Sequence, residues 1–448
     1  MIADYQTIRT HADLSGTVLL PGDAGYAAEI APFNMALTHT PEIVVAATTA
    51  GHISAAVRYA NANDMPLRVQ STGHAYTSIA RGMLISTRRM TTVEIDPELA
   101  TAVVGAGVRW SAVIDAAADH GLAPIIGSSP SVGVVGYLVG GGIGALARSH
   151  GVSSDYLLGA TVVTGTGEIV ETSADQHPDL FWALQGGKLG LGIVTGMRIR
   201  LAPMPALYAG SLFFDEADIE TVLRGWIDWT ATAQEQVTTS IAIIQYPPLD
   251  FVPVPLRGKR VLSVRFAYPG ATGVGERLAA PLRALAPVYI DALGPMELRD
   301  TYQIHNDPPA SCPLWYRGMM LDRIDQTFAT EMLATVGAGT VSPFIGAEIR
   351  HIGSAVRTDR AGGSAVGGRD ASYTCSLFSM NQPDFASVLP EAADAFADRV
   401  RAWRSDVVNA NFAGNKLAKG DTRQNWPDAI RVRLASVRER YDPNGLTA

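Results

Sequence analysis

Three glycine-rich segments divide the first half of the chain, and each lies between segments whose residue pattern predicts regular structure. They span residues 71–74, 127–144 and 186–196. Glycine has no Cβ, so its main chain can approach a ligand closely, and exposed N–H groups at such turns can bind a pyrophosphate. Glycine also lets two backbones pack tightly. A nucleotide-like ligand held by several loops and glycine used for packing are both compatible with this pattern.

The usual nucleotide-binding fingerprints are absent from these segments. Gly105-Ala106-Gly107 follows a predicted strand, but Trp110 stands where the GxGxxG fingerprint has its third glycine. The glycines from Gly140 to Gly144 have the wrong spacing, and no GxxxxGK[ST] segment occurs. The sequence therefore disfavours a nicotinamide dehydrogenase.

Hydrophobic periodicity predicts alternating strands and helices up to about residue 205. We expect helices at 50–64, 110–121 and 178–187, a hairpin at 160–172, and strands at 43–47, 66–70, 83–87 and 91–96, the last two paired. Beyond residue 206 the segments become rich in aromatic residues and proline. There we expect an antiparallel sheet with strands at 261–268, 344–351 and 371–379. The predicted fold class is α+β.

Length, charge and cysteine content exclude several classes of protein. A chain of 448 residues exceeds one ordinary core, so we expect two domains. The formal net charge is −8 and no run of five basic residues occurs, so we expect no nucleic-acid partner. Cys312 and Cys375 lack metal-ligand spacing, so no metal is expected. We see no signal peptide, and the uncharged segment 130–147 holds six glycines, so we expect a cytoplasmic protein without a membrane partner.

Four ordered motifs resemble the flavoprotein superfamily of vanillyl-alcohol oxidase and p-cresol methylhydroxylase, and within it the berberine-bridge-enzyme-like oxidases. The motifs are RVQSTGHAYTSIARGMLISTRRM, SSPSVGVVGYLVGGGIGALARSHG, DLFWALQGGKLGLGIVTGMRIRL and RERYDPNGL. The resemblance covers about 40–205 and the tail. It implies a PCMH-type FAD-binding domain at 1–205 and a substrate-binding domain at 206–409, whose antiparallel sheet covers the isoalloxazine. Residues 410–448 would return to the FAD domain.

The resemblance gives His74 a covalent role. It stands where the family joins an imidazole nitrogen to the 8α-methyl carbon of FAD, which requires a neutral, nucleophilic ring. Doubly attached members carry a cysteine in the pattern Cys-Pro-Thr-Val-Gly, and here the matching residues are Ser129-Pro130-Ser131-Val132-Gly133. Because a hydroxyl is a poor nucleophile beside a thiolate, we predict FAD attached through His74 only.

The other flavin contacts follow from matching loop positions. They are Arg68, Ser71, Thr72, Gly73, Ala75, Ser129, Val132, Gly133, Gly136, Tyr137, Gly140, Gly141, Gly142, Gly144, Gly192, Ile193, Val194 and Asn411. Val132 matches the position that gates oxygen in relatives, and its small side chain favours O2 as the electron acceptor; the alternative is simple packing. Tyr137 either donates to the N1–C2=O region of the reduced flavin or packs over the ring.

The general base is the weakest part of this comparison. Where berberine-bridge-like relatives place a glutamate late in a strand, this chain has Leu377 or Phe378. Tyr373 is our first substitute and Glu348 our second, since either could accept the proton that accompanies hydride loss. Strand alternation places Glu348 on one face together with Arg350. Both candidates could instead be ordinary sheet residues.

Together these features predict an FAD-dependent oxidase that takes a hydride from a C–H or C–OH centre of a small organic substrate. The electrons would pass to O2 and give H2O2. The substrate would be a sugar or a secondary metabolite. One alternative is a flavin dehydrogenase with a non-oxygen acceptor; another is a catalytically weak flavin-binding protein. The sequence does not indicate an oligomeric state.

Overall fold

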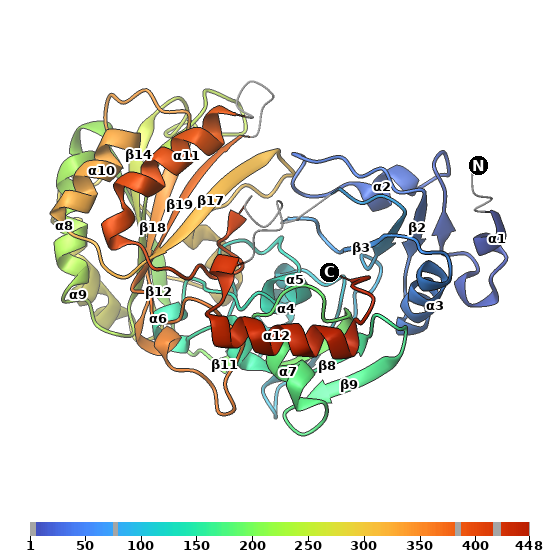
Figure 1. The fold of residues 1–448 in the computed structure, drawn as a ribbon. Coiled ribbons are helices and arrows are strands. Elements are labelled where there is room, and N and C mark those ends of the chain that lie inside the picture. The colour runs from blue at the N-terminus through green and yellow to red at the C-terminus, as the bar shows by residue number, and fades with distance from the viewer. Residues whose placement is uncertain (1–5, 75–78, 381–386, 415–422, 448) are drawn as a thin grey trace.

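The computed structural model describes residues 6–74, 79–380, 387–414 and 423–447. Its three larger sheets each pack against their own helices (Figure 1). The largest sheet and its helices lie on the left of that view, and the N-terminal sheet lies on the right. Segments from the first half of the chain and the C-terminal helix lie between and below them.

The N-terminal sheet has the strand order β1-β2-β4-β3. Strands β2, β4 and β3 are parallel, and β1 is antiparallel to β2. The crossover from β2 to β3 is α3, which buries Ile53 and Val57 against the sheet. The bounds are α1 Gln6–Arg9, β1 Val18–Leu19, α2 Tyr26–Ile30, β2 Ile43–Ala46, α3 Ala50–Ala62, β3 Leu67–Gln70 and β4 Met83–Ser86.

The second sheet is antiparallel, in the order β5-β6-β10-β8-β9. The predicted hairpin at 160–172 is confirmed as β8 and β9. The bounds are β5 Val93–Asp96, β6 Thr101–Gly105, α4 Trp110–Ala118, β7 Leu122–Ala123, α5 Val134–Leu138, α6 Ala147–His150, β8 Leu157–Val163, β9 Ile169–Ser173, α7 Pro178–Leu184, β10 Ile193–Arg200 and β11 Ala202–Pro203; β7 and β11 pair separately.

The predicted pairing of 83–87 with 91–96 is wrong, because the two strands belong to different sheets. All four residues of β4 are buried, and β4 lies between β2 and β3 as a central parallel strand. A strand buried on both faces reads as a continuous apolar run, as MLIS does. Strand β5 alternates between half-buried and exposed residues and is an edge strand beside β6.

The third sheet is an antiparallel, eight-stranded sheet in the order β15-β12-β14-β13-β18-β19-β17, with β16 beside β12. Helices α8, α9, α10 and α11 lie on the same outer side of it (Figure 1). The bounds are β12 Tyr208–Asp215, α8 Ile219–Thr230, β13 Thr238–Gln245, β14 Arg260–Tyr268, α9 Thr272–Arg283, β15 Ile290–Asp291, β16 Gly294–Pro295, β17 Leu314–Leu321, α10 Gln326–Val336, β18 Gly346–His351, β19 Tyr373–Met380 and α11 Val388–Arg399.

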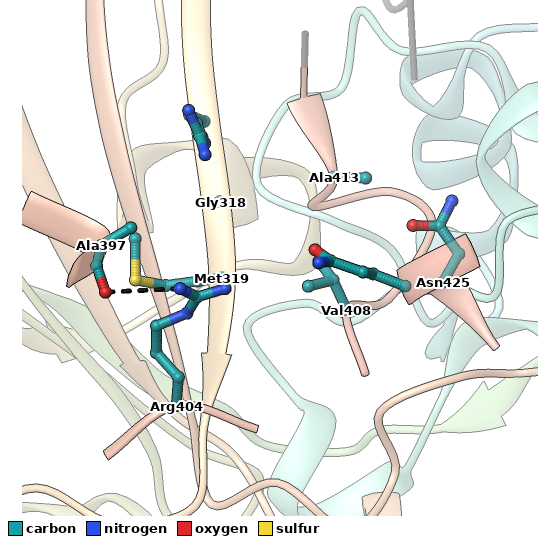
Figure 2. A pocket seen from close by; sticks show the side chains of 9 residues that line it. Gly318, Met319, Ala397, Arg404, Val408, Ala413 and Asn425 are labelled. Carbon is teal, nitrogen blue, oxygen red and sulfur yellow. Dashed lines mark hydrogen bonds between the residues drawn. The ribbon is translucent and has the colours of Figure 1, made fainter. Parts of the chain in front are cut away.

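After α11 the chain leaves the large sheet and returns to the second sheet. Helix α12, Asp428–Tyr441, packs against α7, and the Gly165 amide donates to the Tyr441 carbonyl at 2.7 Å. A small pocket lies where the returning segment passes β17; it is lined by Arg317, Gly318, Met319, Ala397, Arg404, Val408, Ala413, Gln424 and Asn425 (Figure 2). The limits 1–205, 206–409 and 410–448 remain predictions.

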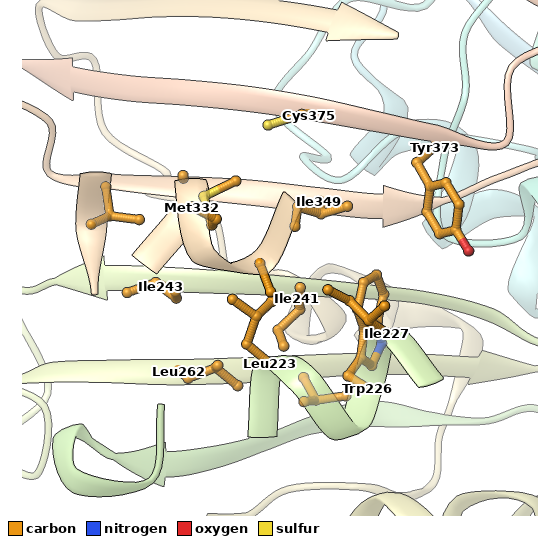
Figure 3. Packing of buried hydrophobic residues seen from close by; sticks show 14 of the residues in the cluster. Leu223, Trp226, Ile227, Ile241, Ile243, Leu262, Met332, Ile349, Tyr373 and Cys375 are labelled. Carbon is orange, nitrogen blue, oxygen red and sulfur yellow. The ribbon is translucent and has the colours of Figure 1, made fainter. Parts of the chain in front are cut away.

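Alternation along the strands gives the large sheet two different faces. Figure 3 shows one of them, where Ile241, Leu262 and Ile349 meet Leu223 and Trp226 of α8 in a shared core. Neighbouring residues point the other way, because successive side chains of a strand alternate. They form a surface that we call the polar face, made of Ser240, Ser263, Arg265, Glu348, Arg350 and Thr374.

Candidate functional site

His74 is held in one orientation by contacts to both ring nitrogens and to one ring face. Its Nδ1 lies 3.0 Å from the Thr72 Oγ1, and its Nε2 lies 2.9 Å from the Ser131 Oγ. The ring stacks on Phe33 with centroids 3.7 Å apart and planes 10° apart. Burial, reinforced by the positive charge of Arg109, lowers the pKa of His74 to about 3. The imidazole is therefore neutral at physiological pH and retains a nucleophilic nitrogen.

The loop that carries His74 is fixed to a distant strand by residues 33–35. The Phe33 and Asn34 amides donate to the carbonyls of Thr72 and Gly73, at 2.9 and 3.0 Å. The Asn34 side chain also bonds both main-chain groups of Leu314, at the start of β17. Sequence reasoning missed Phe33 and Asn34, because nothing in the linear pattern relates them to residue 314.

Two serines next to His74 extend the contact chain into the second glycine-rich loop. The Ser129 Oγ lies 2.8 Å from the Ser131 Oγ, which in turn contacts His74. Ser129 therefore lies two hydroxyl contacts from the imidazole. Val132 is half-buried; its carbonyl accepts from the Trp110 amide at 3.0 Å, and its side chain packs against the second-sheet core.

Several glycines of the second loop are required by packing inside the protein. A Cβ on Gly140 would lie 2.0 Å from the Asn411 Oδ1, and one on Gly144 would lie 1.6 Å from the Ile126 carbonyl oxygen. A Cβ on Gly142, where φ is +86°, would lie 2.4 Å from the Tyr137 ring. Gly136 differs, since nothing lies within 4 Å of its Cβ position. The packing explanation that the sequence left open thus accounts for part of this loop.

Tyr137 is wedged between glycine backbones. Its ring abuts Gly127 and Gly142 and meets Trp110 edge-on, with centroids 6.0 Å apart. Its hydroxyl is buried and lies beside the Ser153 side chain. Burial raises the pKa of Tyr137 to about 12, so the phenol keeps its proton and remains a hydrogen-bond donor. Its predicted role beside a flavin stays a prediction.

The polar face of the large sheet meets this second loop. The Arg350 Nη2 lies 3.5 Å from the Ser128 Oγ, and its guanidinium carbon lies 5.6 Å from the centre of the Phe412 ring. Ser128 precedes Ser129, and Phe412 follows Asn411. Tyr316 of β17 adds another contact by donating to the Asn411 carbonyl at 3.2 Å. The polar face therefore covers the loops that carry Ser129 and Asn411.

Glu348 lies at the centre of a buried ionic cluster on the polar face. Its Oε1 is 2.8 Å from the Arg265 Nη1, and its Oε2 is 2.7 Å from the Arg350 Nε. The His305 Nε2 lies 3.6 Å from Oε1, and neither ring nitrogen of His305 has a hydrogen-bond partner among the described residues. Burial alone would raise the pKa of Glu348, but the charges of Arg350 and Arg265 hold it below its ordinary value.

The structure places Tyr373 away from this cluster, on the opposite face of the sheet. Its hydroxyl contacts the Thr230 Oγ1 of α8 at 2.9 Å, its ring stacks on His351, and it borders the helix-packed core (Figure 3). Across strands β18 and β19, Glu348 pairs with Ser376 and His351 pairs with Tyr373. Side chains alternate along each strand, so Glu348 points to one face of the sheet and Tyr373 points to the other. Tyr373 and Glu348, our two candidates for the base, therefore cannot act at one site.

Asn411 and Lys188 join the returning segment to the second loop. The Asn411 Nδ2 donates to the Tyr137 carbonyl at 2.8 Å, and the Lys188 Nζ donates to the Asn411 Oδ1 at 2.8 Å and to the Gly136 carbonyl at 3.0 Å. Asn411 was predicted from the sequence. Lys188 was not, although its position inside a glycine-rich motif could have revealed it.

The remaining predicted contacts lie near these loops without forming one surface. Gly133 lies against Ser71 and Thr72, and Gly73 has a φ of +68°. The Arg68 Nη1 donates to the Leu67 carbonyl at 3.0 Å. Gly141 has a φ of +96°. The Gly192 amide donates to the Thr447 Oγ1. The side chains of Ile193 and Val194 lie in two separate hydrophobic cores. Ala75 lies outside the described residues.

These residues fit a flavin nucleotide. The buried Ser71 Oγ beside the first loop lacks a hydrogen-bond partner among the described residues. A buried polar atom costs free energy unless it is satisfied, so this hydroxyl fits a polar group bound there. The neutral His74 adds a nucleophile, and Gly136 adds unobstructed backbone.

Comparison with known proteins identifies the cofactor. Residues 41–173 match a family model described as FAD binding domain. The chain contains an FAD-binding domain. This segment includes β2, the His74 loop, the second glycine-rich loop and β9, so it carries most of the predicted flavin contacts.

The relatives of the FAD-binding domain include named oxidases. (R)-6-hydroxynicotine oxidase of Paenarthrobacter nicotinovorans is 29% identical over 298 residues, which are 64% of this chain and 62% of that protein. Two further curated relatives, uncharacterised FAD-linked oxidoreductases of Bacillus subtilis, align over 52% of their length. The chain thus spans between half and two thirds of the length of these three curated relatives.

Solved structures show that the whole fold is shared. Physcomitrella patens BBE-like 1 superposes with a TM-score of 0.82 at 18% identity, covering 97% of this chain and 96% of that one. Glucooligosaccharide oxidase from Acremonium strictum, described with 6-S-cysteinyl, 8α-N1-histidyl FAD, gives 0.80 at 20% identity over 96% and 95%. The predicted α+β, PCMH-type fold and the resemblance to this flavoprotein superfamily are confirmed.

The part of the chain that the structure describes holds neither a cluster of metal ligands nor a membrane-spanning helix. No group of three or more histidine, cysteine, aspartate or glutamate side chains in this part of the chain is arranged to hold a metal ion. Over the same residues, no helix has the length and apolar character needed to cross a membrane.

Proposed function

We propose that the chain is an FAD-dependent oxidase whose flavin is bound covalently through His74 alone. The observation that carries this proposal is the geometry of His74, a neutral imidazole held between two hydroxyls in the loop of an FAD-binding domain. The histidyl FAD of glucooligosaccharide oxidase and the oxidase names of the relatives support it. Ser129 occupies the position where a cysteine would be needed for a second bond.

When bound, FAD would supply the 8α carbon and the oxidising chemistry that attachment needs, with O2 as the final oxidant. The neutral imidazole of His74 would supply the nucleophilic nitrogen and would lose its ring N–H proton. Thr72 and Ser131 hold the ring by both nitrogens, so one nitrogen keeps its hydroxyl contact while the other reacts. Stacking on Phe33 fixes the plane of attack.

When bound, FAD would accept a hydride from the substrate and deliver the electrons to O2. The chain's own residues would build the chamber around this chemistry. Arg350 and Arg265 present two fixed positive charges on the polar face, and Glu348 holds both of them. Because its pKa lies below the ordinary value, Glu348 is a weak proton acceptor, which favours a positioning role over the role of base. Sugars and secondary metabolites remain the proposed substrate classes.

The test is to denature the purified holoprotein with acid and follow the yellow colour. Colour in the pellet, with a tryptic peptide around His74 heavier by the mass of FAD, is the expected result. His74→Ala should release the flavin into the supernatant, whereas His120→Ala, an exposed histidine, should not. A His74→Ala protein that keeps its colour in the pellet would overturn the attachment. Reoxidation of the reduced holoprotein in air-saturated buffer, followed by stopped flow, tests the oxidase assignment.

A further inference from the structure

Lys188 combines two unfavourable features in one residue of the third glycine-rich segment. Its φ is +65°, a strained left-handed conformation that residues other than glycine rarely adopt. Its side chain is half-buried, and burial lowers the pKa of Lys188 to about 8. The ammonium group is still mostly protonated at neutral pH. A strained, half-buried cation persists where the surrounding structure and its function require it.

The surroundings of Lys188 hold the charge without neutralising it. Its Nζ donates to the Gly136 carbonyl at 3.0 Å and to the Asn411 Oδ1 at 2.8 Å, and both acceptors are uncharged. No ion pair joins it to a carboxylate of the described residues, and burial is the cause of its pKa shift. An ammonium has three donors, so one donor is left for another group. A bound anion would both use this donor and balance the charge.

The position of Lys188 shows which part of a bound flavin it would serve. The xylene edge must lie at His74 and the Ser129–Ser131 pair if His74 is the attachment site. Lys188 instead contacts Gly136 and, through Asn411, the carbonyl of Tyr137, both within α5. Ser131 precedes the first residue of this helix, so the contacts of Lys188 lie farther along the chain of the second loop than those of His74. The far position corresponds to the pyrimidine end of the ring.

We propose that Lys188 supplies the positive charge that stabilises the negative charge on the pyrimidine end of the reduced flavin. It acts directly or through Asn411 as a positioning residue, and it raises the tendency of the flavin to accept electrons. This inference rests on the proposed function, because it needs FAD in the site with its xylene edge at His74. The strained φ is then retained for the charge that a glycine could not provide.

The test compares three variants of the holoprotein. Lys188→Met removes the charge, Lys188→Arg keeps it, and Lys259→Met removes a lysine that contacts Tyr289, away from these loops. The readouts are the flavin midpoint potential against a reference dye, and the affinity for sulfite, whose adduct with the flavin places negative charge on the same end of the ring. We expect Lys188→Met to lower the potential and weaken sulfite binding at least tenfold, while Lys188→Arg and Lys259→Met stay within threefold of the wild type.

A fourth variant keeps the test decisive if Lys188→Met folds poorly. Lys188→Gly relieves the strained φ, so it should melt at or above the wild-type temperature without flavin and still show the lower potential. Equal potentials and sulfite affinities in wild type and Lys188→Met would overturn the proposal, as would a wild-type holoprotein that binds no sulfite. Flavin loss from Lys188→Met in a His74→Ala background, with sulfite affinity unchanged, would assign Lys188 to the phosphates instead. Wild-type protein without any flavin would refute the proposed function itself.

Discussion

Replacing Glu348 by glutamine leaves two buried guanidinium groups without their shared carboxylate. The side chains of Glu348, Arg265 and Arg350 are 11%, 8% and 13% exposed, so solvent does little to screen the loss. Breaking a buried ion pair by removing one partner costs about 3–5 kcal/mol, whereas an exposed pair is worth about 0–1 kcal/mol. We expect Glu348→Gln to lower the free energy of unfolding by about 3–5 kcal/mol.

Urea unfolding followed by tryptophan fluorescence measures this difference at neutral pH. Glu220→Gln is the matched control, because Glu220 pairs with Arg224 at 2.8 Å on the surface of α8 and is 65% exposed. This control should cost about 0.5 kcal/mol or less. If Glu348→Gln lowers the free energy of unfolding by less than about 1 kcal/mol, the Glu348 cluster is worth no more than an exposed ion pair, and the expected effect of its burial is refuted.

The same difference should depend on pH in a defined direction. The folded-state pKa of Glu348 lies below the ordinary value of 4.5, so its stabilising contribution is complete above that value. The contribution is lost as pH falls through the folded-state pKa. The gap in stability between wild type and Glu348→Gln should therefore be constant near neutrality and narrow below about pH 4.5. A gap that widens on acidification would contradict this sign.

Four further predictions concern the flavin site and the opposite face of the sheet. Val132→Leu should slow reoxidation by O2 about tenfold, or about 1.4 kcal/mol, and spare reduction by substrate; unchanged reoxidation in stopped flow would end the gating assignment. Ser129→Cys should add a second bond to FAD, seen as a cross-linked tryptic peptide that Ser128→Cys does not form. Tyr373→Phe should lower the free energy of unfolding by about 1 kcal/mol, because the contact to Thr230 is lost, and it should leave the rate of flavin reduction unchanged. Slower flavin reduction in this variant would make Tyr373 a candidate for the base again. Because the pKa of His74 is about 3, the rate at which FAD is incorporated into the flavin-free protein should be the same at pH 8 and pH 5. A fall in this rate of about thirtyfold at pH 5 would mean that His74 has an ordinary histidine pKa.

Local pattern was sufficient to predict most elements of the FAD-binding half. The β8–β9 hairpin and helix α3 follow from turn chemistry and apolar spacing, which act between near neighbours. Local pattern was not sufficient to predict which strands pair with each other. MLIS at 83–86 and VEID at 93–96 look like a hairpin in the sequence, and only the burial of the first on both faces decides otherwise.

The site was predictable where a motif carries it and unpredictable where contacts join distant segments. His74, Ser129 and Asn411 stand in recognisable motifs. Alternation correctly grouped Glu348 with Arg350, but it could not tell which face of the sheet the helices cover, and that choice removed Tyr373 from the site. Arg265 and His305 reach Glu348 from other elements, so no local pattern marks them.

The attachment of residues 33–35 to both His74 and β17 sets the order in which the molecule can assemble. During synthesis, Phe33 and the His74 loop emerge early, but Asn34 lacks its partner until Leu314 has been made. The second loop waits still longer for Asn411, and Gly165 for Tyr441. These loops can therefore reach their final arrangement only after residues as far along as 441 have been made. Segments that leave the ribosome far apart in time have to fold together.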